Sequence, residues 1–260
     1  MATIVFLVLG ITHLNIGEKR LQSAWNIGLG NVRPQNLIMG LGLPSLGNAS
    51  IAVSTLIANT PQVLFSFLYV CYNAMFTNFF LAYEWSKFAV QRKYLRVSHA
   101  VGQQKSTYFV NLPYRYGLPL LIGSGLLHWL VSQALFLANI TIIPRDGMIP
   151  MQDEITTVAY SPLAMLLVLC LGIVFLLFLL ATACRKLPVG MPLVGSNSLA
   201  IAAACHPPLV DQSEREEMVL RPITWGAVPG KVDADEFGAI GHCCFSDRVV
   251  EPPETGKLYA

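Results

Sequence analysis

The segment SPLAMLLVLCLGIVFLLFLLATAC (residues 161–184) contains no acidic or basic side chain. A helix of about 20 residues crosses the ~30 Å hydrocarbon core of a bilayer, so this segment is long enough to span it. Pro162 suits the first turn of a helix, and the basic residues Arg185 and Lys186 follow its end. The segment therefore predicts a transmembrane helix and makes a membrane protein the leading class for the chain.

The composition of the whole chain supports this class. Of the 260 residues, 54% are hydrophobic and 12% are charged, and the mean hydropathy is +0.54. Soluble domains carry about 25% charged residues. The formal net charge of +2 is too small to indicate a nucleic-acid partner. We therefore expect the lipid bilayer as the main partner and no nucleic acid.

Two more charge-poor stretches have the length of a span. NTPQVLFSFLYVCYNAMFTNFFLAYEW predicts a helix over about 61–83, and GLPLLIGSGLLHWLVSQALFLAN predicts another over about 117–139. With the helix at about 160–184, the sequence predicts an all-α membrane protein with three complete transmembrane helices. The opening MATIVFLVLGI is apolar but too short to span, so we interpret it as the remnant of a helix.

This interpretation divides the chain into three regions. Residues 1–60 hold the short apolar segment and a flexible outer segment, 61–186 form the transmembrane region, and 187–260 form a cytosolic tail. In the tail, SEREEMV indicates a short helix or turn, whereas VLRPITWGAV and AIGHCCFS are typical of strands. A small irregular or β unit is therefore expected at the C-terminus.

Basic residues predict the orientation of a multi-pass membrane protein. The loop between the first two predicted helices has six of them against the single acid Glu84: Lys87, Arg92, Lys93, Arg96, Lys105 and Arg115. Because such loops stay in the cytosol, this loop and the C-terminal tail are expected there. Asn48, in the sequon NAS, then lies outside as a candidate glycosylation site. Cys184, at the inner boundary, is either palmitoylated or a plain boundary cysteine.

Polar side chains recur at helical spacing in the first two predicted spans. They form a candidate intramembrane polar face: Gln62, Ser66, Tyr69 and Asn73 on one helix, and Ser124, His128 and Gln133 on the next. An unpaired imidazole or amide in hydrocarbon is costly. We therefore expect the two stripes to face each other or further upstream helices, with His128 bonded to Asn73, Tyr69 or Ser66. The stripes either join helices or line a proton or substrate path.

The sequence offers little for catalysis. The runs Cys205-His206 and His242-Cys243-Cys244 contain zinc-type ligands, but their spacing matches no standard finger. No catalytic triad, carboxylate pair or metalloprotease motif can be assembled, so we expect no enzyme, catalytic residue, metal or cofactor. Two classes of function remain. One is a structural or signalling membrane component, and the alternative is a subunit or fragment of a transporter or channel with a polar intramembrane path.

Several strings together resemble one family. NTPQVLFSFLYVCYNAMFTNFFLAYEWSKFA, GQQKSTYFVNLPYRYGLPLLIGSGLLHWLVSQALF, GMPLVGSNSLAIAAACHPP, GHCCFS and the ending GKLYA resemble the C-terminal part of fungal multi-pass membrane proteins of unknown function. Members of that family are longer, with more helices upstream and an N-terminal domain of unknown function. The resemblance implies that this chain is part of a longer product, whose upstream helices or other membrane subunits would be its partners. It implies no functional residue.

Overall fold

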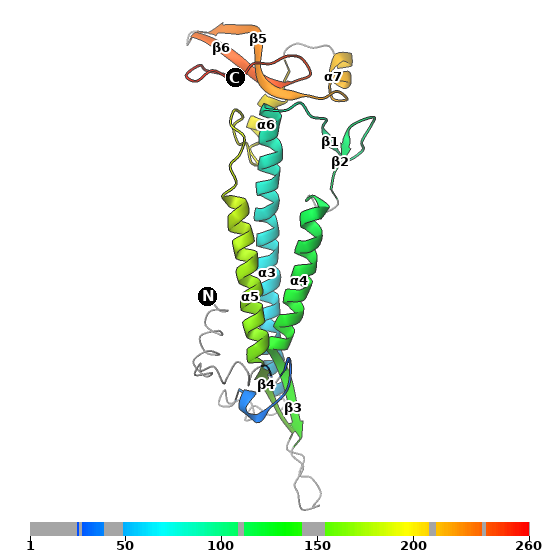
Figure 1. The fold of residues 1–260 in the computed structure, drawn as a ribbon, viewed down its shortest axis with the longest axis vertical. Coiled ribbons are helices and arrows are strands. Elements are labelled where there is room, and N and C mark those ends of the chain that lie inside the picture. Colours follow the sequence, from blue (N-terminus) through cyan, green and yellow to red (C-terminus); the bar gives the residue numbers. More distant parts are fainter. Residues whose placement is uncertain are drawn as a thin grey trace, which may run out of the picture. The chain divides into compact units, whose positions relative to one another are not determined.

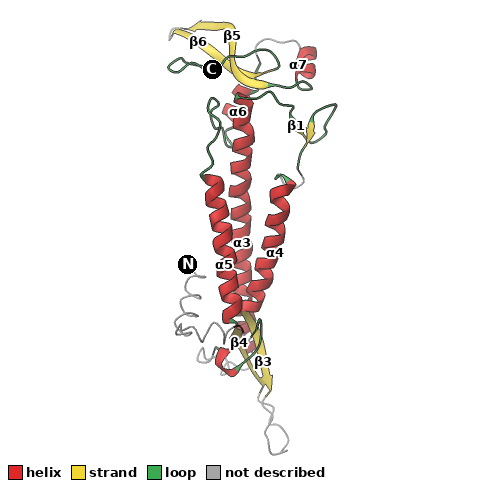
Figure 2. Ribbon diagram, viewed as in Figure 1, coloured by secondary structure: helices red, strands yellow, loops and turns green. Residues whose placement is uncertain are grey.

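The structure, a computed structural model, describes residues 25, 28–38, 49–108, 112–141, 154–207, 212–235 and 238–259. The chain divides into two compact units: one has residues 1–73 and 118–180, and the other has 74–117 and 181–260. The long helix α3 (Ala49–Ser86) contributes residues to both units. Figure 1 labels the helices and strands, and Figure 2 distinguishes them by colour.

Three helices dominate the first unit: α3, α4 (Tyr114–Ala134) and α5 (Pro162–Ala183). Their sequences are apolar on nearly every side, so contacts between them depend on close packing of Leu, Val and small residues. One cluster joins α4 to α5 and is covered by Phe65 of α3; its buried members are Leu130, Val131, Ala134, Ala164 and Val168. This cluster is the core of the helical part of the unit.

Phe175 of α5 makes a second set of contacts in this unit. Its ring lies over Gly123 of α4, where an added Cβ would come within 2.6 Å of the ring. The ring also meets that of Tyr72 edge-on at 5.6 Å between centroids, and the Tyr72 hydroxyl donates a hydrogen bond to the Phe175 carbonyl. Phe175 therefore contacts both other helices of the unit.

The helix α3 is longer than the sequence predicts. It begins at Ala49 rather than near residue 61, and Pro61 lies inside it. A proline removes one backbone hydrogen bond but does not have to end a helix that continues on both sides. At the start of α3, the Ser50 hydroxyl donates to the Thr156 carbonyl at 3.1 Å, which ties this first turn to the neighbouring strand.

That strand belongs to a hairpin-like sheet in the first unit. β3 (Leu135–Thr141) pairs antiparallel with β4 (Glu154–Tyr160). The described segment 28–38, which includes the 3-10 helix η1 (Pro34–Asn36), packs against β4: the Ile38 amide donates to the Val158 carbonyl at 2.9 Å. Of the predicted flexible outer segment, Leu37 and Ile38 are therefore fixed by backbone pairing with β4.

The second unit is built around a different sheet. β5 (Thr224–Asp235) and β6 (Gly238–Ser246) pair antiparallel, with a register shift between Ala227 and Val232. The short elements η3 (Lys87–Ala89), β1 (Arg96–Val97), β2 (Lys105–Ser106), α6 (Ser198–Ala204) and α7 (Gln212–Met218) complete its described part. β6 and α7 lie where the tail sequence predicts a strand and a short helix, whereas β5 begins five residues after the start of VLRPITWGAV and ends seven residues beyond it.

The core of this unit joins the tail to the end of α3. Its buried residues come from the segment before α6, from α6 and from both strands: Met191, Ala204, Ile223, Trp225, Cys243 and Phe245. The rings of Trp85 and Phe88 meet Phe245 edge-on at 5.2 and 5.4 Å. The backbone of Lys93 exchanges two 2.9 Å hydrogen bonds with Ile223, which fixes the start of β5. The tail core therefore includes residues from well before residue 187.

The predicted fold class is wrong in its main statement. Among the described helices, two rather than three are long and apolar enough to cross a membrane: α3 extended through η3 (Ala49–Ala89), and α5. The predicted span over 117–139 is not one of the two: α4 ends at Ala134 and the chain continues as β3. Three two-stranded sheets also exclude an all-α fold. An apolar run such as LFLAN fits a buried strand as well as a helix, and its partner strand decides between them.

Candidate functional site

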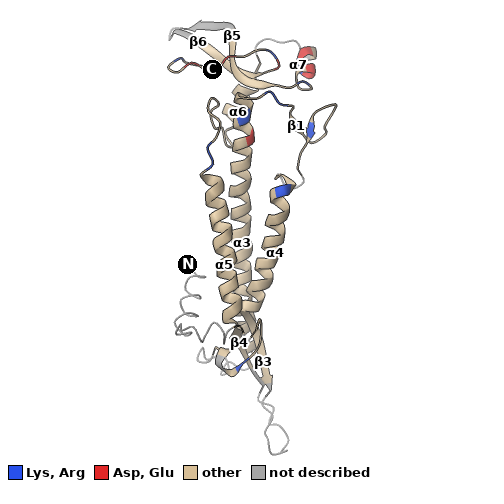
Figure 3. Ribbon diagram, viewed as in Figure 1, with Lys and Arg blue, Asp and Glu red and all other residues tan. Residues whose placement is uncertain are grey.

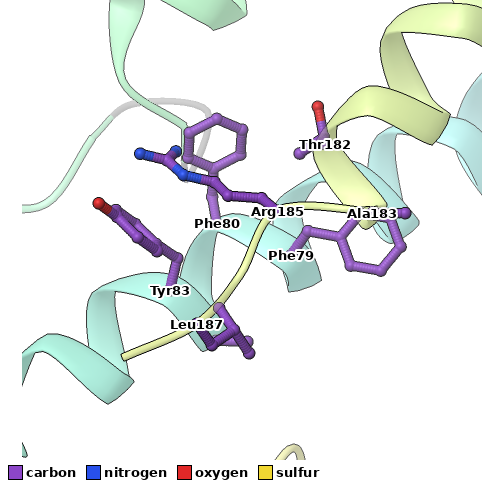
Figure 4. A pocket seen from close by; sticks show the side chains of 8 residues that line it. Phe79, Phe80, Tyr83, Thr182, Ala183, Arg185 and Leu187 are labelled. Atoms are coloured by element: carbon purple, nitrogen blue, oxygen red, sulfur yellow. The ribbon is translucent and has the colours of Figure 1, made fainter. Parts of the chain in front are cut away.

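The end of α3 and the chain that follows α5 bring basic and aromatic side chains together in the second unit. Tyr83 and Lys87 are four residues apart, so they lie on one face of α3 and its continuation. The Lys87 ammonium lies 4.3 Å from the centre of the Tyr83 ring. The Arg185 guanidinium lies 3.7 Å from the same centre. One ring therefore holds two cations, and Figure 4 shows one of them, Arg185, beside Tyr83.

A small pocket lies beside these cations. Its volume is about 50 Å³, and its lining is mostly apolar: Phe79, Phe80, Ala82, Tyr83, Thr182, Ala183, Arg185 and Leu187. Figure 4 shows Arg185 extending from the end of α5 toward Tyr83, beside Phe80. We refer to this pocket together with Lys87 as the Tyr83 site. It combines an apolar wall with two positive charges.

The charge of the Tyr83 site is not balanced by neighbouring acids. Glu84, the acid on the same turn of α3, pairs with Arg96 at 3.2 Å. Arg96 in turn lies 4.0 Å from the centre of the Tyr108 ring and donates to its hydroxyl at 3.0 Å. Within the described ranges, no ion pair joins a carboxylate to Lys87 or Arg185.

The positive charge of Lys87 also acts on the nearby Lys93, although burial has the larger effect on its pKa. Partial burial lowers the pKa of its ammonium, and the charge of Lys87 lowers it further, whereas Glu84 acts in the opposite direction. Figure 3 shows the wider pattern: the basic and acidic positions gather near helix ends and in the second unit, while α5 is free of charge along its length.

The candidate zinc ligands of the sequence do not form a metal site. The part of the chain that the structure describes contains no group of three or more His, Cys, Asp or Glu side chains placed to hold an ion. His242 Nε2 lies 2.7 Å from the His206 carbonyl oxygen, so the two runs do meet. However, burial raises the pKa of the Cys243 thiol, and burial with the adjacent Cys243 raises that of Cys244 to about 11. A raised pKa makes the thiolate, the form that binds metals, less accessible.

The comparisons with known proteins give the family. A family model described as a domain of unknown function, DUF8419, matches residues 1–259. The chain belongs to the DUF8419 family. No match was found among curated proteins or among solved structures.

The predicted polar face of this DUF8419 chain consists of two separate groups. On α3, Gln62, Tyr69 and Asn73 are partly buried, and the exposed Ser66 donates to the Gln62 carbonyl of its own helix at 3.0 Å. On α4, Ser124 is buried, His128 is partly buried, and Gln133 donates to Ser132 at 3.4 Å. Across the described helices, no hydrogen bond joins one stripe to the other, and His128 makes none. The facing of the stripes stays a prediction.

The sequence offers two candidate modification sites, Asn48 and Cys184, and the structure describes only Cys184. Asn48 lies outside the described residues. Cys184 is exposed and immediately follows α5. Its neighbour Arg185 belongs to the Tyr83 site, so Cys184 lies at the edge of that site.

Sequence reasoning missed the Tyr83 site itself. The sequence shows Tyr83 and Lys87 as a helical i, i+4 pair, but it gives Lys87 a role only in orientation. Arg185 is about a hundred residues further along the chain. Its approach to Tyr83 depends on how the ends of α3 and α5 pack. No local sequence pattern predicts that packing.

Proposed function

We propose that this DUF8419 chain is an integral, multi-pass membrane protein that lies in the bilayer through α3 and α5. The observation that supports this is the exposure of their apolar surface. In the most apolar window of each helix, 11% of α3 and 17% of α5 is buried inside the protein. A core helix of a soluble protein would be mostly buried, and a signal sequence would lie near the N-terminus, so neither alternative explains these helices.

The energetics favour the bilayer for α5. Seven of its large apolar side chains are at least 39% exposed: Leu166, Ile173, Val174, Leu176, Leu177, Phe178 and Leu180. Burying such a side chain is worth about 1.5–3 kcal/mol, so leaving all of them in water would cost a large fraction of the stability of a domain. With 22 residues, α5 is about 33 Å long, which matches the hydrocarbon thickness.

The basic residues support one orientation. Lys87 follows α3, and Arg185 and Lys186 follow α5, so the C-terminal ends of both helices carry positive charge. Positive residues beside a span favour the cytosolic side. We therefore place the C-terminal tail, with β5 and β6, in the cytosol, and the segment around Asn48 on the opposite side. Because α3 and α5 then both end on the cytosolic side, the chain between them has to return across the bilayer through the stretch that contains α4. Plasma membrane and endomembrane both fit this orientation.

For the role of the protein, we propose a structural or signalling membrane component rather than an enzyme. The described cytosolic part is a small sheet with an aromatic core fixed to the end of α3, which suits a platform beside the membrane. The resemblance to fungal multi-pass proteins of unknown function supports a membrane role and extends the proposal to a fungal family.

Two substitutions test the membrane part of the proposal. Val174, near the middle of α5, is 59% exposed, and Leu193, outside the helices, is 61% exposed. In water both should accept arginine, but a charge at the bilayer centre costs at least about 2.5 kcal/mol. Val174→Arg should therefore release part of the tagged chain from membranes into the alkaline carbonate supernatant, while Leu193→Arg should stay in the pellet. Full release of the unmodified chain, or equal retention of both variants, would contradict the proposal.

Orientation has its own test. A tag after residue 260 should resist protease in sealed cells and be digested after permeabilisation. Digestion from outside intact cells would place the tail on the wrong side.

A further inference from the structure

The Tyr83 site has the composition of a lipid headgroup site. Lys87 and Arg185 share the Tyr83 ring at 4.3 and 3.7 Å, although two cations repel each other. Glu84, the acid on the same turn of α3, is engaged by Arg96. Cation–π contacts hold the two charges in place but leave both of them positive. An anion bound beside them would offset both charges.

The side chains of the site also indicate which kind of anion fits. A guanidinium stacked on a ring keeps its N–H donors in its own plane, where they match phosphate oxygens, and a lysine adds a point charge. The pocket next to these groups is apolar, with Phe79, Phe80, Ala183 and Leu187 in its wall. A free phosphate would gain nothing from this wall, whereas the first carbons of an acyl chain would be buried by it.

We propose that the Tyr83 site binds one anionic phospholipid, with its phosphate paired to Arg185 and Lys87 and its glycerol and proximal acyl carbons against the pocket. The inference rests on the proposed membrane location, because the site follows the ends of the two candidate spans. It assigns one defined ligand to Lys87 and Arg185, which otherwise serve as orientation signals. The occupant is a lipid of the cytosolic leaflet, where anionic headgroups concentrate.

The test is a lipid titration of the purified full chain in a neutral detergent, with bound lipid counted by native mass spectrometry. The probes are dioleoyl phosphatidic acid, dioleoyl phosphatidylcholine and glycerol 3-phosphate. We expect phosphatidic acid to bind about tenfold more tightly than phosphatidylcholine, which has the same chains without net charge. Glycerol 3-phosphate has the anion without the chains, and we expect no competition from it at millimolar concentration.

Variants locate the site. In Lys87→Gln with Arg185→Gln, the apparent Kd for phosphatidic acid should rise about thirtyfold, the equivalent of about 2 kcal/mol, with no change for phosphatidylcholine. Arg185→Lys keeps the charge and should stay within about threefold of the unmodified chain. The matched control is Arg115→Gln, which also removes a cation held over a tyrosine, 5.0 Å from the centre of Tyr116, but does not line the pocket. It should change the Kd by less than about twofold.

Two results would overturn the inference. One is equal phosphatidic acid binding by the double variant and Arg115→Gln. The other is full competition by glycerol 3-phosphate, which would identify a site for a soluble phosphate. Flotation with phosphatidylcholine vesicles separates this failure from that of the proposed function. A chain that does not float contradicts the membrane location, whereas a chain that floats and ignores headgroup charge contradicts the lipid site alone.

Discussion

Phe245 offers the sharpest test of how the tail is held. Its side chain is 7% exposed, and its ring meets Trp85 and Phe88 edge-on at 5.2 and 5.4 Å. Truncating a buried Phe to Ala costs about 3–5 kcal/mol, and this range already includes the loss of aromatic pairs worth about 0.5–1.5 kcal/mol each. Because two such pairs are lost together, we expect Phe245→Ala to lower the free energy of unfolding of the second unit by about 4 kcal/mol.

The assay is urea unfolding in detergent, followed by tryptophan emission. Trp85 and Trp225 belong to this core, so Trp25 and Trp129 are first replaced by Phe to isolate the signal. With a urea slope of about 2 kcal/mol per M, a loss of about 4 kcal/mol lowers the midpoint by about 2 M.

The control is Val249→Ala, at a side chain that is 77% exposed, which should change the free energy by less than about 0.5 kcal/mol. If the two variants unfold at the same urea concentration, β6 does not pack against the end of α3, and the description of the second unit fails.

Three further predictions concern the helices and the buried thiols. Gly123→Ala and Gly125→Ala both gain about 1 kcal/mol of helix propensity. Only at Gly123 does the new Cβ meet the Phe175 ring. The melting temperature in detergent should therefore rise for Gly125→Ala and not for Gly123→Ala. Burial raises the pKa of the Cys244 thiol in the folded chain from 9.0 to about 11. Its contribution to stability is therefore full below pH 9 and is lost as the pH rises toward 11. The urea midpoint should fall over this window, and it should fall less in Cys244→Ala. Replacing His128 by Gln should preserve folding yield better than replacing it by Leu if the ring joins helices, and equal yields would show that the ring is merely tolerated.

The local parts of the fold were predictable because their signals are local. The tail strands carry β-branched and aromatic residues between Gly and Pro, and α5 is an unbroken apolar run after Pro162. Period and composition suffice for such elements.

The hairpin was missed for the opposite reason. Residues 135–139 continue an apolar helix pattern, and their strand state depends on pairing with residues 156–160, about twenty positions away. The start of α3 was missed because Pro61 was given more weight than the helix-compatible residues before it. The Tyr83 site was also out of reach, since Arg185 joins it only through packing.

The predicted boundary between the transmembrane region and the tail, at residue 187, does not separate two folded parts in the second unit. Its sheet comes from the tail, but the rings that cover Phe245 come from α3 and η3, and the backbone of Lys93 extends the pairing of β5 at Ile223. Arg92 adds hydrogen bonds from its guanidinium to the carbonyls of Asp247 and Arg248 at 2.9 and 2.7 Å. A tail without these partners would expose Phe245 and Trp225 and leave β5 with one fewer anchored end. We therefore expect the sheet to lose stability when the end of α3 is displaced, and the proposed lipid at Lys87 and Arg185, by fixing that end, should stabilise the sheet.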